Sequence, residues 1–232
     1  MTHEIVLFLD VDNTLLDNDR IIADLRRHLE EELDVASSDR YWAIFEKLRG
    51  ELGYADYLGA LQRCRVEMEH GGAGDQRLLL MSSFLVDYPF ADRLYPDALE
   101  VVARLGQIGP TVILSDGDVV FQPRKVQRSG LWDAVGGRVL IYIHKEKMLE
   151  QVQRLYPARR YVMVDDKLRI LAAMKAVLGD RLVTVFPRQG HYAHDAEAIA
   201  TYAAADVTVE RIGDLLEFDA GKLLGAATKE KS

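Results

Sequence analysis

The chain has 232 residues, of which 49% are hydrophobic and 28% charged, and its formal net charge is −8. This length and composition are typical of a globular protein with a sizeable core, arranged as one large domain or two unequal ones. The negative charge argues against a nucleic-acid polymer as partner, because polymer binding works through a broad basic face. It leaves open a small anionic substrate that is bound in a local basic pocket.

The single cysteine and the N-terminus bear on location. Cys64 is the only cysteine, so an intrachain disulfide is impossible and a reducing, cytoplasmic setting is expected. No basic segment precedes the first apolar run, so we expect no secretory signal. The longest apolar stretch, 78–86, is interrupted by two serines and is too short to span a bilayer. We therefore expect no membrane as partner.

Short apolar runs rich in valine, isoleucine and leucine recur along the chain. They lack the alternation of a half-exposed strand, so they predict buried parallel strands. The predicted strands are Ile5–Leu9, Thr111–Leu114, Val139–Tyr142, Tyr161–Val164 and Leu182–Phe186, with Val207–Val209 as a possible edge strand. Helical patterns separate them at Asp97–Leu105, Val119–Ser129, Glu146–Leu155, Leu168–Leu178 and Asp195–Ala204. This alternation predicts a doubly wound α/β sheet.

One stretch breaks the alternation. About a hundred residues separate the first two predicted strands, far more than one crossover helix needs. Within 20–88 apolar residues recur with helical spacing, and glycines 71 and 72 mark a break between helices. We interpret 17–91 as a small helical domain inserted after the first strand. Residues 1–16 and 92–232 then form the α/β core.

The most informative motif follows the first predicted strand. Ile5–Leu9 runs directly into Asp10, Asp12 and Thr14. A buried strand of an open α/β sheet delivers its reactive groups at its C-terminal end. Two carboxylates there can hold a divalent cation and leave one free to attack a substrate. The alternative is that both aspartates are solvated turn formers, which their position after an apolar strand disfavours.

A second acidic pair follows the strand at 161–164. Asp165 and Asp166 place like charges side by side, which is costly without a cation. If this strand neighbours the first, Asp10, Asp12 and Asp166 converge on one point. Hard oxygen ligands there favour Mg²⁺. The alternative for this pair is capping of the helix that follows.

Two further strand ends carry candidate anion-binding groups. Ser115 follows the second strand, and its hydroxyl could form an anion site with the backbone N–H groups of the next helix, with Asp116 in the same turn. Taken alone, Ser115 would more often be a helix cap. Lys145 follows the third strand, where its ammonium could neutralise the carboxylates and bind a transferring oxyanion. Lys147 is a rival for that role.

Four strand ends thus supply Asp/Asp, Ser, Lys and Asp/Asp in chain order, and in this order the sequence resembles the haloacid dehalogenase-like (HAD) superfamily. Asp10-Val-Asp12-Asn-Thr14 resembles the first motif of that superfamily, Ser115 the second, Lys145 the third and Asp165-Asp166 the fourth. The resemblance covers 1–16 and 92–210. It implies a HAD-like Rossmannoid core, and the helical segment lies where the superfamily places a C1-type cap.

The resemblance implies a mechanism of phosphoryl transfer. Asp10 would attack phosphorus and form an aspartyl-phosphate, and Asp12 would protonate the leaving oxygen and then activate water. Mg²⁺ would be held by the Asp10 side chain, the Asp12 backbone carbonyl and the fourth motif. Phosphate binding and orientation of the loop would fall to Thr14, Ser115, Asp116 and Lys145.

The fourth motif departs from the superfamily pattern Gly-Asp-x-x-x-Asp. Asp166 matches the first aspartate of the pattern, but Asp165 replaces the glycine and Ile170 replaces the second aspartate. This match favours Asp166 as the direct metal ligand. Asp165 could take over the role of the second acid, such as holding Lys145. The choice between Asp165 and Asp166 as metal ligand stays open on the sequence.

Asp12 separates branches of the superfamily. Dehalogenase members lack the second aspartate, since they have no alkoxide leaving group to protonate, so its presence indicates phosphoryl transfer. We expect a Mg²⁺-dependent phosphatase that acts on a small phosphorylated metabolite. The alternatives are a phosphomutase or phosphotransferase of the same superfamily and a catalytically silent scaffold that binds phosphorylated ligands. Monomer and dimer are both compatible with the sequence.

Residues outside the motifs are weaker candidates for substrate contact. Three arginines of the helical segment, Arg49, Arg63 and Arg65, could reach an anion, although a solvated helix face is the simpler interpretation. Lys125 is expected to support the site from behind at most. The segment 189–194 follows the fifth strand on the same edge and could contact substrate or the helical segment.

Overall fold

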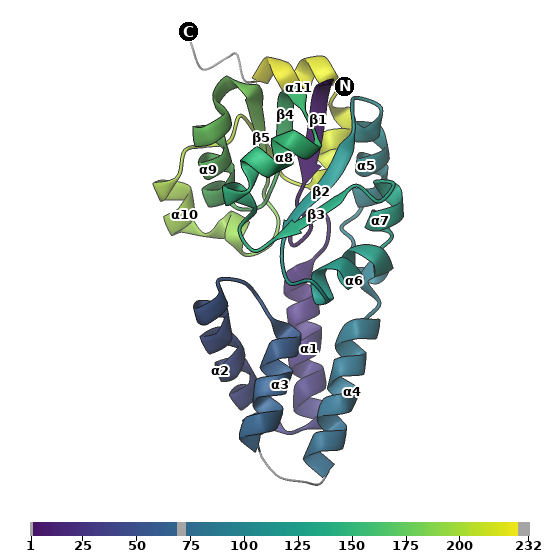
Figure 1. The fold of residues 1–232 in the computed structure, drawn as a ribbon, viewed down its shortest axis with the longest axis vertical. Helices are drawn as coiled ribbons and strands as arrows, with labels where there is room; N and C mark the ends of the chain where they lie inside the picture. The colour runs from purple at the N-terminus through teal and green to yellow at the C-terminus, as the bar shows by residue number, and fades with distance from the viewer. Residues whose placement is uncertain (1, 69–72, 227–232) are drawn as a thin grey trace.

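The computed structural model describes residues 2–68 and 73–226, so the break predicted at glycines 71 and 72 lies outside the described residues. The described residues contain a six-stranded parallel sheet with the order β3-β2-β1-β4-β5-β6, which confirms the predicted doubly wound α/β fold (Figure 1). Its strands are β1 (His3–Leu9), β2 (Thr111–Asp116), β3 (Val139–Tyr142), β4 (Ala158–Val164), β5 (Leu182–Pro187) and β6 (Val207–Val209).

The register brings the important strand ends together. Leu9, the last residue of β1, pairs with Ile113 of β2 on one side and with Val164 of β4 on the other. Because the strands are parallel, the segments that follow β1, β2 and β4 leave the sheet at the same edge. The three sequence motifs that follow these strands therefore meet at this edge.

The sheet is buried on both faces, because successive apolar residues of each strand point to opposite faces. Along β1, Ile5, Leu7 and Leu9 join one apolar cluster, whereas Val6 and Phe8 join a second cluster on the opposite face. The first cluster includes residues of α5 (Ala98–Gly106), α6 (Phe121–Arg128), α7 (Leu131–Ala134) and α11 (Ala220–Ala226). The second includes residues of α8 (Leu149–Leu155) and α9 (Leu168–Leu178).

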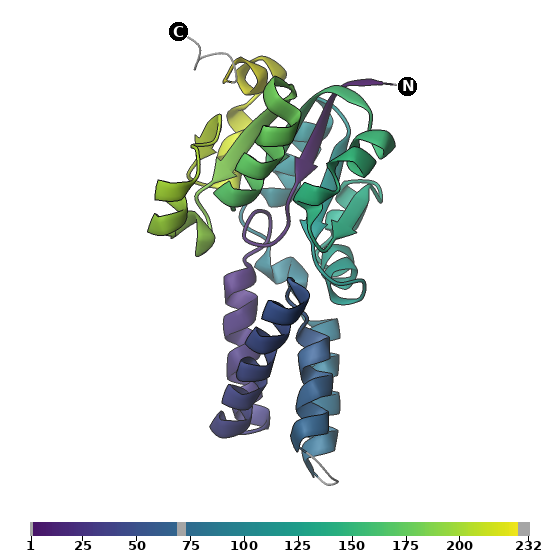
Figure 2. The same ribbon diagram turned by 60° about the vertical axis from the view of Figure 1, so that its left-hand side comes forward.

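Four helices of the inserted segment form a bundle beyond the C-terminal edge of the sheet (Figures 1 and 2). They are α1 (Asn18–Glu32), α2 (Val35–Leu52), α3 (Tyr57–Met68) and α4 (Ala73–Asp87). Asp17 starts α1 by accepting a hydrogen bond from the N–H of Arg20 at 2.9 Å. Two neighbouring chain segments connect the bundle to the sheet, since Leu16 forms an antiparallel bridge with Leu94.

Several predicted boundaries differ from the structure. β2 is two residues longer than predicted, so Ser115 and Asp116 belong to the strand and pair with β3. The helix predicted from Val119 begins at Phe121, because the carboxylate of Asp118 accepts the N–H groups of Val120 and Phe121 at 2.7 and 2.6 Å.

Two later helices also differ from their predicted bounds. The helix predicted from Glu146 begins at Leu149, after the 3₁₀ turn η2 (Lys145–Lys147). The helix predicted over Asp195–Ala204 is the shorter α10 (Ala196–Thr201), which is preceded by η4 (Tyr192–His194). The remaining 3₁₀ turns are η1 (Phe90–Arg93), η3 (Gly179–Arg181) and η5 (Ile212–Glu217). In the parts of the chain that the structure describes, no helix is both long and apolar enough to cross a membrane.

Candidate active site

Asp10 lies where β1 ends, and its side chain is at the centre of a buried polar cluster. Its backbone N–H donates to the carbonyl of Val164 at 3.0 Å, which fixes the end of β1 against the end of β4. The residue is 3% exposed. Ser115 and Lys145 approach Asp10 from the β2 and β3 side, and Asp165 and Asp166 lie on the β4 side.

Lys145 neutralises two of these carboxylates. Its Nζ lies 2.5 Å from Oδ1 of Asp10 and 2.6 Å from Oδ2 of Asp165, and it donates to the carbonyl of Leu114 at 3.2 Å. Burial disfavours the ammonium ion, but Asp10, Asp165 and Asp116 outweigh burial and hold the pKa of Lys145 above its ordinary value. The lysine is therefore a fixed positive charge at the end of the sheet.

The two adjacent aspartates of the fourth motif have different surroundings. Asp165 pairs with Lys145 and accepts the N–H of Lys167 at 2.8 Å. Both carboxylate oxygens of Asp166 are buried and have no hydrogen-bond partner among the described residues. Burial, with Asp165 and Asp10 nearby, raises the pKa of Asp166 well above its usual range. Burial also raises the pKa of Asp165, to about 6, although Lys145 opposes the shift.

This difference tests whether the cluster fits a cation. One carboxylate oxygen from each of Asp10, Asp165 and Asp166 lies within 4.8 Å of the others. Buried oxygens without a donor are costly unless a ligand satisfies them. The hard oxygen donors and the two orphaned oxygens of Asp166 fit a Mg²⁺ ion. Asp165 already has a cationic partner, so the Asp166 oxygens are the ones left for a metal.

Two hydroxyl groups position the Asp10 carboxylate. The Thr14 hydroxyl donates to Oδ2 of Asp10 at 3.4 Å and accepts the backbone N–H of Asp166 at 3.1 Å. The Ser115 hydroxyl donates to Oδ1 of Asp10 at 3.3 Å. Asp116 acts on Lys145, because its Oδ1 accepts the backbone N–H of Lys145 at 2.8 Å. Thr14, Ser115 and Asp116 therefore each contact a residue of the acidic cluster or Lys145.

Asp12 is held by Lys125, which lies behind the site, where the sequence placed it. Lys125 is 1% exposed, and its Nζ lies 2.6 Å from Oδ1 of Asp12 and 2.9 Å from Oδ1 of Asn18. Gln122 donates to Oδ2 of Asp12 at 3.4 Å and to the Ser115 hydroxyl at 3.0 Å. The sequence indicates that Lys125 is buried, because its spacing from Phe121 puts the lysine on the inward face of α6.

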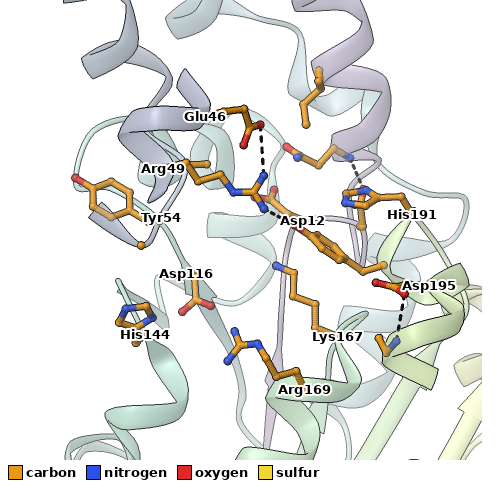
Figure 3. A pocket seen from close by; sticks show the side chains of 18 of the residues that line it. Asp12, Glu46, Arg49, Tyr54, Asp116, His144, Lys167, Arg169, His191 and Asp195 are labelled. Atoms are coloured by element: carbon orange, nitrogen blue, oxygen red, sulfur yellow. Dashed lines mark hydrogen bonds and ion pairs between the residues drawn. The ribbon is translucent and has the colours of Figure 1, made fainter. Parts of the chain in front are cut away.

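A cavity of about 650 Å³ lies between the sheet edge and the bundle. Asp12 and Lys167 line it from the core, and Arg49 lines it from α2 (Figure 3). Trp42 and Phe45 of α2 line it as well. The Asp12 side chain is 26% exposed, unlike the buried Asp10. Asp12 therefore lines the cavity, and Asp10 lies behind its wall.

The weaker candidates separate clearly. Arg49 lines the cavity, whereas Arg63 does not and pairs with Glu51 at 2.7 Å on the surface. Arg65 also does not line it. Of the 189–194 segment, His191 and Tyr192 line the cavity and His194 does not. Lys147 is exposed and lies outside the cavity wall, so Lys145 is the lysine that reaches the acids.

The loop after β5 lies against the loop after β1 at one close contact. Asn13 has a φ of 60° and its side chain binds the N–H groups of Asn18 and Asp19 at 3.0 and 3.2 Å. Gly190 has a φ of 69°, and a Cβ at this position would lie 2.4 Å from Cβ of Asn13. Any side chain at 190 would therefore push against the turn that carries Asp12.

A buried acid cluster with a fixed lysine, at the C-terminal edge of a doubly wound sheet, defines a hydrolase site of the HAD type. Residues 6–177 match the family model of the haloacid dehalogenase-like hydrolases. The chain therefore belongs to this family, and the resemblance found in the sequence is confirmed. No curated protein matches the chain in sequence.

Solved structures agree with this assignment. The chain is 69% identical to a family member from Burkholderia xenovorans LB400, over 94% of this chain and all of that one, with a TM-score of 0.88. A magnesium-bound HAD-hydrolase from Bacillus subtilis, YfnB, is 18% identical over 94% and 100% of the chains, with a TM-score of 0.59. An L-2-haloacid dehalogenase from Xanthobacter autotrophicus is 18% identical over 93% and 97%, with a TM-score of 0.56. The last two show a shared fold.

Proposed function

We propose that this HAD-like hydrolase is a Mg²⁺-dependent phosphatase that acts on a small phosphorylated metabolite through an aspartyl-phosphate. The observation that carries the proposal is the second carboxylate, Asp12, which borders the cavity and is held by Lys125. A phosphomonoester releases an alkoxide that needs a proton, whereas a departing halide does not. A positioned acid beside the nucleophile therefore favours phosphate esters over haloacids.

In the proposed reaction, an Asp10 oxygen forms a bond to phosphorus while the bond from phosphorus to the leaving oxygen breaks. Asp12, which carries the proton that it took from water in the preceding turnover, gives this proton to that oxygen. Asp12, now a carboxylate, removes a proton from water, and the water oxygen attacks phosphorus and releases the Asp10 carboxylate and phosphate. Lys145 and Ser115 hold Asp10 in place through both steps.

The residues that would hold Mg²⁺ are Asp10 and Asp166, with the backbone carbonyl of Asp12 as the superfamily pattern implies. When bound, the ion neutralises charge on the phosphoryl group. Asp165 is assigned to Lys145, on the strength of their 2.6 Å ion pair. The free oxygens of Asp166 support this division of roles.

We further propose that 17–91 is a cap domain that closes the site. Its helices α2 and α3 supply one wall of the cavity, including Trp42, Phe45 and Tyr57. A covered site excludes water during the first step and selects substrates by size. The buried position of Asp10 behind this wall favours a metabolite over a folded protein as substrate.

The test compares release of phosphate with release of halide. We expect the purified protein with Mg²⁺ to release phosphate from members of a panel of sugar phosphates, nucleotides and phospho-acids, and no halide from 2-haloacids. The Asp10→Asn variant is the control for contaminating phosphatases. Halide release would contradict the proposal, and so would isomerisation of a phosphate ester without release of phosphate.

A further inference from the structure

Two cationic side chains from different parts of the fold meet at Tyr192, on the wall of the cavity. Nζ of Lys167, next to the fourth motif, lies 4.8 Å from the centre of the Tyr192 ring. Arg49 of α2 donates from Nη2 to the Tyr192 hydroxyl at 2.7 Å. In Figure 3 the charged ends of Arg49 and Lys167 point toward the same part of the cavity.

The ammonium group of Lys167 has no directly paired carboxylate among the described residues. Burial is outweighed by Asp166, Asp10 and Asp165, which together raise the pKa of Lys167 above its ordinary value. In the part of the chain that the structure describes, its Nζ makes no ion pair and no hydrogen bond and lies over the Tyr192 ring. This sets Lys167 apart from Lys125 and Lys145, whose ammonium groups lie within 2.6 Å of carboxylates. A cation that lines a cavity without a carboxylate partner is available to an anionic ligand.

Arg49 is only weakly neutralised. Its carboxylate partner, Glu46, lies 3.6 Å away, and 62% of the Glu46 side chain is exposed. Exposed pairs of this kind contribute little. Two like charges that approach one tyrosine repel each other, and an anion bound between them would remove the repulsion.

The other charges on this side of the cavity are accounted for. Arg169 pairs with Glu146 at 3.2 Å. Asp195 accepts the N–H groups of Glu197 and Ala198 at 2.9 and 3.1 Å, and Glu197 itself is exposed. Arg26 of α1 also lines the cavity, and its guanidinium lies over the Trp42 ring at 4.7 Å. Among the described residues, the two cations of the cavity that meet at one residue are those at Tyr192.

We propose that Arg49 and Lys167, which meet at Tyr192, form a subsite for a second anionic group of the substrate. This inference rests on the proposed phosphatase function and narrows its substrate class to phosphomonoesters that also carry a carboxylate or a second phosphate. The size of the cavity, about 650 Å³, leaves room for such a group beyond the transferred phosphate. Trp42 and Phe45 would pack against the carbon skeleton between the two anions.

The experiment uses matched substrates that differ in the second anion. 3-Phosphoglycerate is compared with glycerol 3-phosphate, and glucose 1,6-bisphosphate with glucose 1-phosphate, by kcat/KM for phosphate release. The first pair tests a carboxylate and the second pair tests a phosphate. We expect the wild-type protein to prefer the doubly anionic member of at least one pair by about tenfold or more.

Variants assign the preference to the subsite. Lys167→Met and Arg49→Gln should each reduce the preference by about tenfold, mainly through KM, and Lys167→Arg should retain most of it. Lys147→Met is the matched control, because it removes a lysine charge from an exposed position of the same sheet edge outside the cavity. This control should keep the wild-type preference.

Three outcomes would overturn the subsite: no preference in the wild-type protein, an equal loss of both members of a pair in Lys167→Met, or the same loss of preference in Lys147→Met. Absence of phosphate release from every ester, including p-nitrophenyl phosphate, would instead contradict the proposed function. In that case calorimetry decides the subsite. The Asp10→Asn variant should bind the doubly anionic member of a pair more tightly than the singly anionic member, and addition of Lys167→Met should abolish this difference. Equal affinities of Asp10→Asn for both members would overturn the subsite.

Discussion

The two walls of the cavity hold their charged groups in different ways. Directly behind the core wall, Asp10, Lys145 and Asp165 are each at most 3% exposed and are joined by ion pairs of 2.5 and 2.6 Å. On the bundle wall, 44% of the Arg49 side chain is exposed, and its ion pair measures 3.6 Å. Removal of one partner from a buried pair costs about 3–5 kcal/mol, whereas an exposed pair contributes about 0–1 kcal/mol.

The difference separates chemistry from selection. Groups behind the core wall are fixed before substrate arrives, so no reorganisation is needed when charge develops in the reaction. Groups on the bundle wall can change with little loss of stability, so this wall is free to vary with the substrate. Substitutions in the buried cluster of Asp10, Lys145 and Asp165 should therefore affect every substrate, and those at the subsite of Arg49 and Lys167 should affect particular ones.

The largest effect is expected from Asp10→Asn behind the core wall. An amide cannot form the aspartyl-phosphate, so kcat should fall by at least about 10⁴-fold for every substrate. The variant should remain folded, because Lys145 keeps Asp165 as a partner. The measurement is steady-state phosphate release with circular dichroism as the control for folding. Retention of wild-type activity would remove Asp10 from the reaction.

Asp12→Asn should have a smaller effect that depends on the leaving group. For alkyl phosphates kcat should fall by about 10²–10⁴-fold, because the leaving alkoxide loses its acid. p-Nitrophenolate needs little protonation, so formation of the phosphoenzyme from p-nitrophenyl phosphate should be affected less. Rapid-quench kinetics with both substrates tests this. An equal decrease in the rate of phosphoenzyme formation with both substrates would show that Asp12 does not act as the acid.

Asp165 and Asp166 should respond to substitution with opposite signs in the metal-free protein. Asp166→Asn removes a buried carboxylate that has no partner, so it should stabilise, whereas Asp165→Asn takes a partner from Lys145 and should destabilise by about 3 kcal/mol. Saturating Mg²⁺ at about 100 times its Kd should stabilise the wild-type protein by about 2.7 kcal/mol and leave Asp166→Asn unchanged. Thermal unfolding with EDTA or Mg²⁺ measures both effects. An equal Mg²⁺ response in wild type and Asp166→Asn would contradict the assigned ligand.

Lys125→Met tests how Asp12 is held. The substitution leaves Asp12 and Asn18 without their shared donor, so the free energy of unfolding should fall by about 1–3 kcal/mol. Turnover of alkyl phosphates should fall by about 10- to 100-fold, because the acid is no longer oriented. The pH dependence of kcat should also shift, which a purely structural role of Lys125 would not cause. An unchanged pH profile would contradict the role assigned to Lys125.

The smallest effect concerns the bundle and its dependence on pH. Asp24 of α1 accepts hydrogen bonds from Tyr88 and Arg93 at 2.5 and 2.8 Å, beside the segment that returns to the sheet. Burial opposes these contacts, but they prevail and lower the pKa of Asp24 below its ordinary value of 3.8. The stabilisation is therefore present above about pH 4 and is lost as the pH falls through the lowered pKa.

Asp24→Asn should accordingly lower the free energy of unfolding by about 1–2 kcal/mol at pH 7 and by less near pH 3. Urea unfolding at the two pH values measures the difference. Asp39→Asn on α2 is the control, since Asp39 is exposed. A difference between Asp24→Asn and wild type that does not depend on pH would contradict the charge on Asp24 as its cause.

The core wall was largely predictable from the sequence, and the bundle wall was not. The strand ends can be recognised in the sequence, because an apolar run such as Ile5–Leu9 stops at charged residues. Parallel strands bring such ends to one edge of the sheet. Asp165 was foreseen as a partner of Lys145, because it replaces the glycine of the superfamily pattern. Lys125 was expected to support the site from behind, but its partner could not be predicted, because Asp12 lies 113 residues away along the chain.

The contact between Arg49 and Tyr192 could not be predicted from the sequence for a related reason. They lie 143 residues apart on elements without shared periodicity, and only the placement of the bundle over the sheet brings them together. Short-range chemistry also moved boundaries that hydrophobic patterns cannot resolve. The Asp118 carboxylate holds the N–H groups that would otherwise begin α6 two residues earlier.

Gly190 makes the loop after β5 a constraint on how this protein can vary. The residue performs no chemistry and is far along the chain from Asp10. Yet its missing side chain gives Asn13 the space to keep the first turn in its left-handed conformation. A mutant library of the cavity would find position 190 as intolerant as a catalytic position. In such data, intolerance at Gly190 would report the space that the Asp12 turn needs, and no contact with substrate.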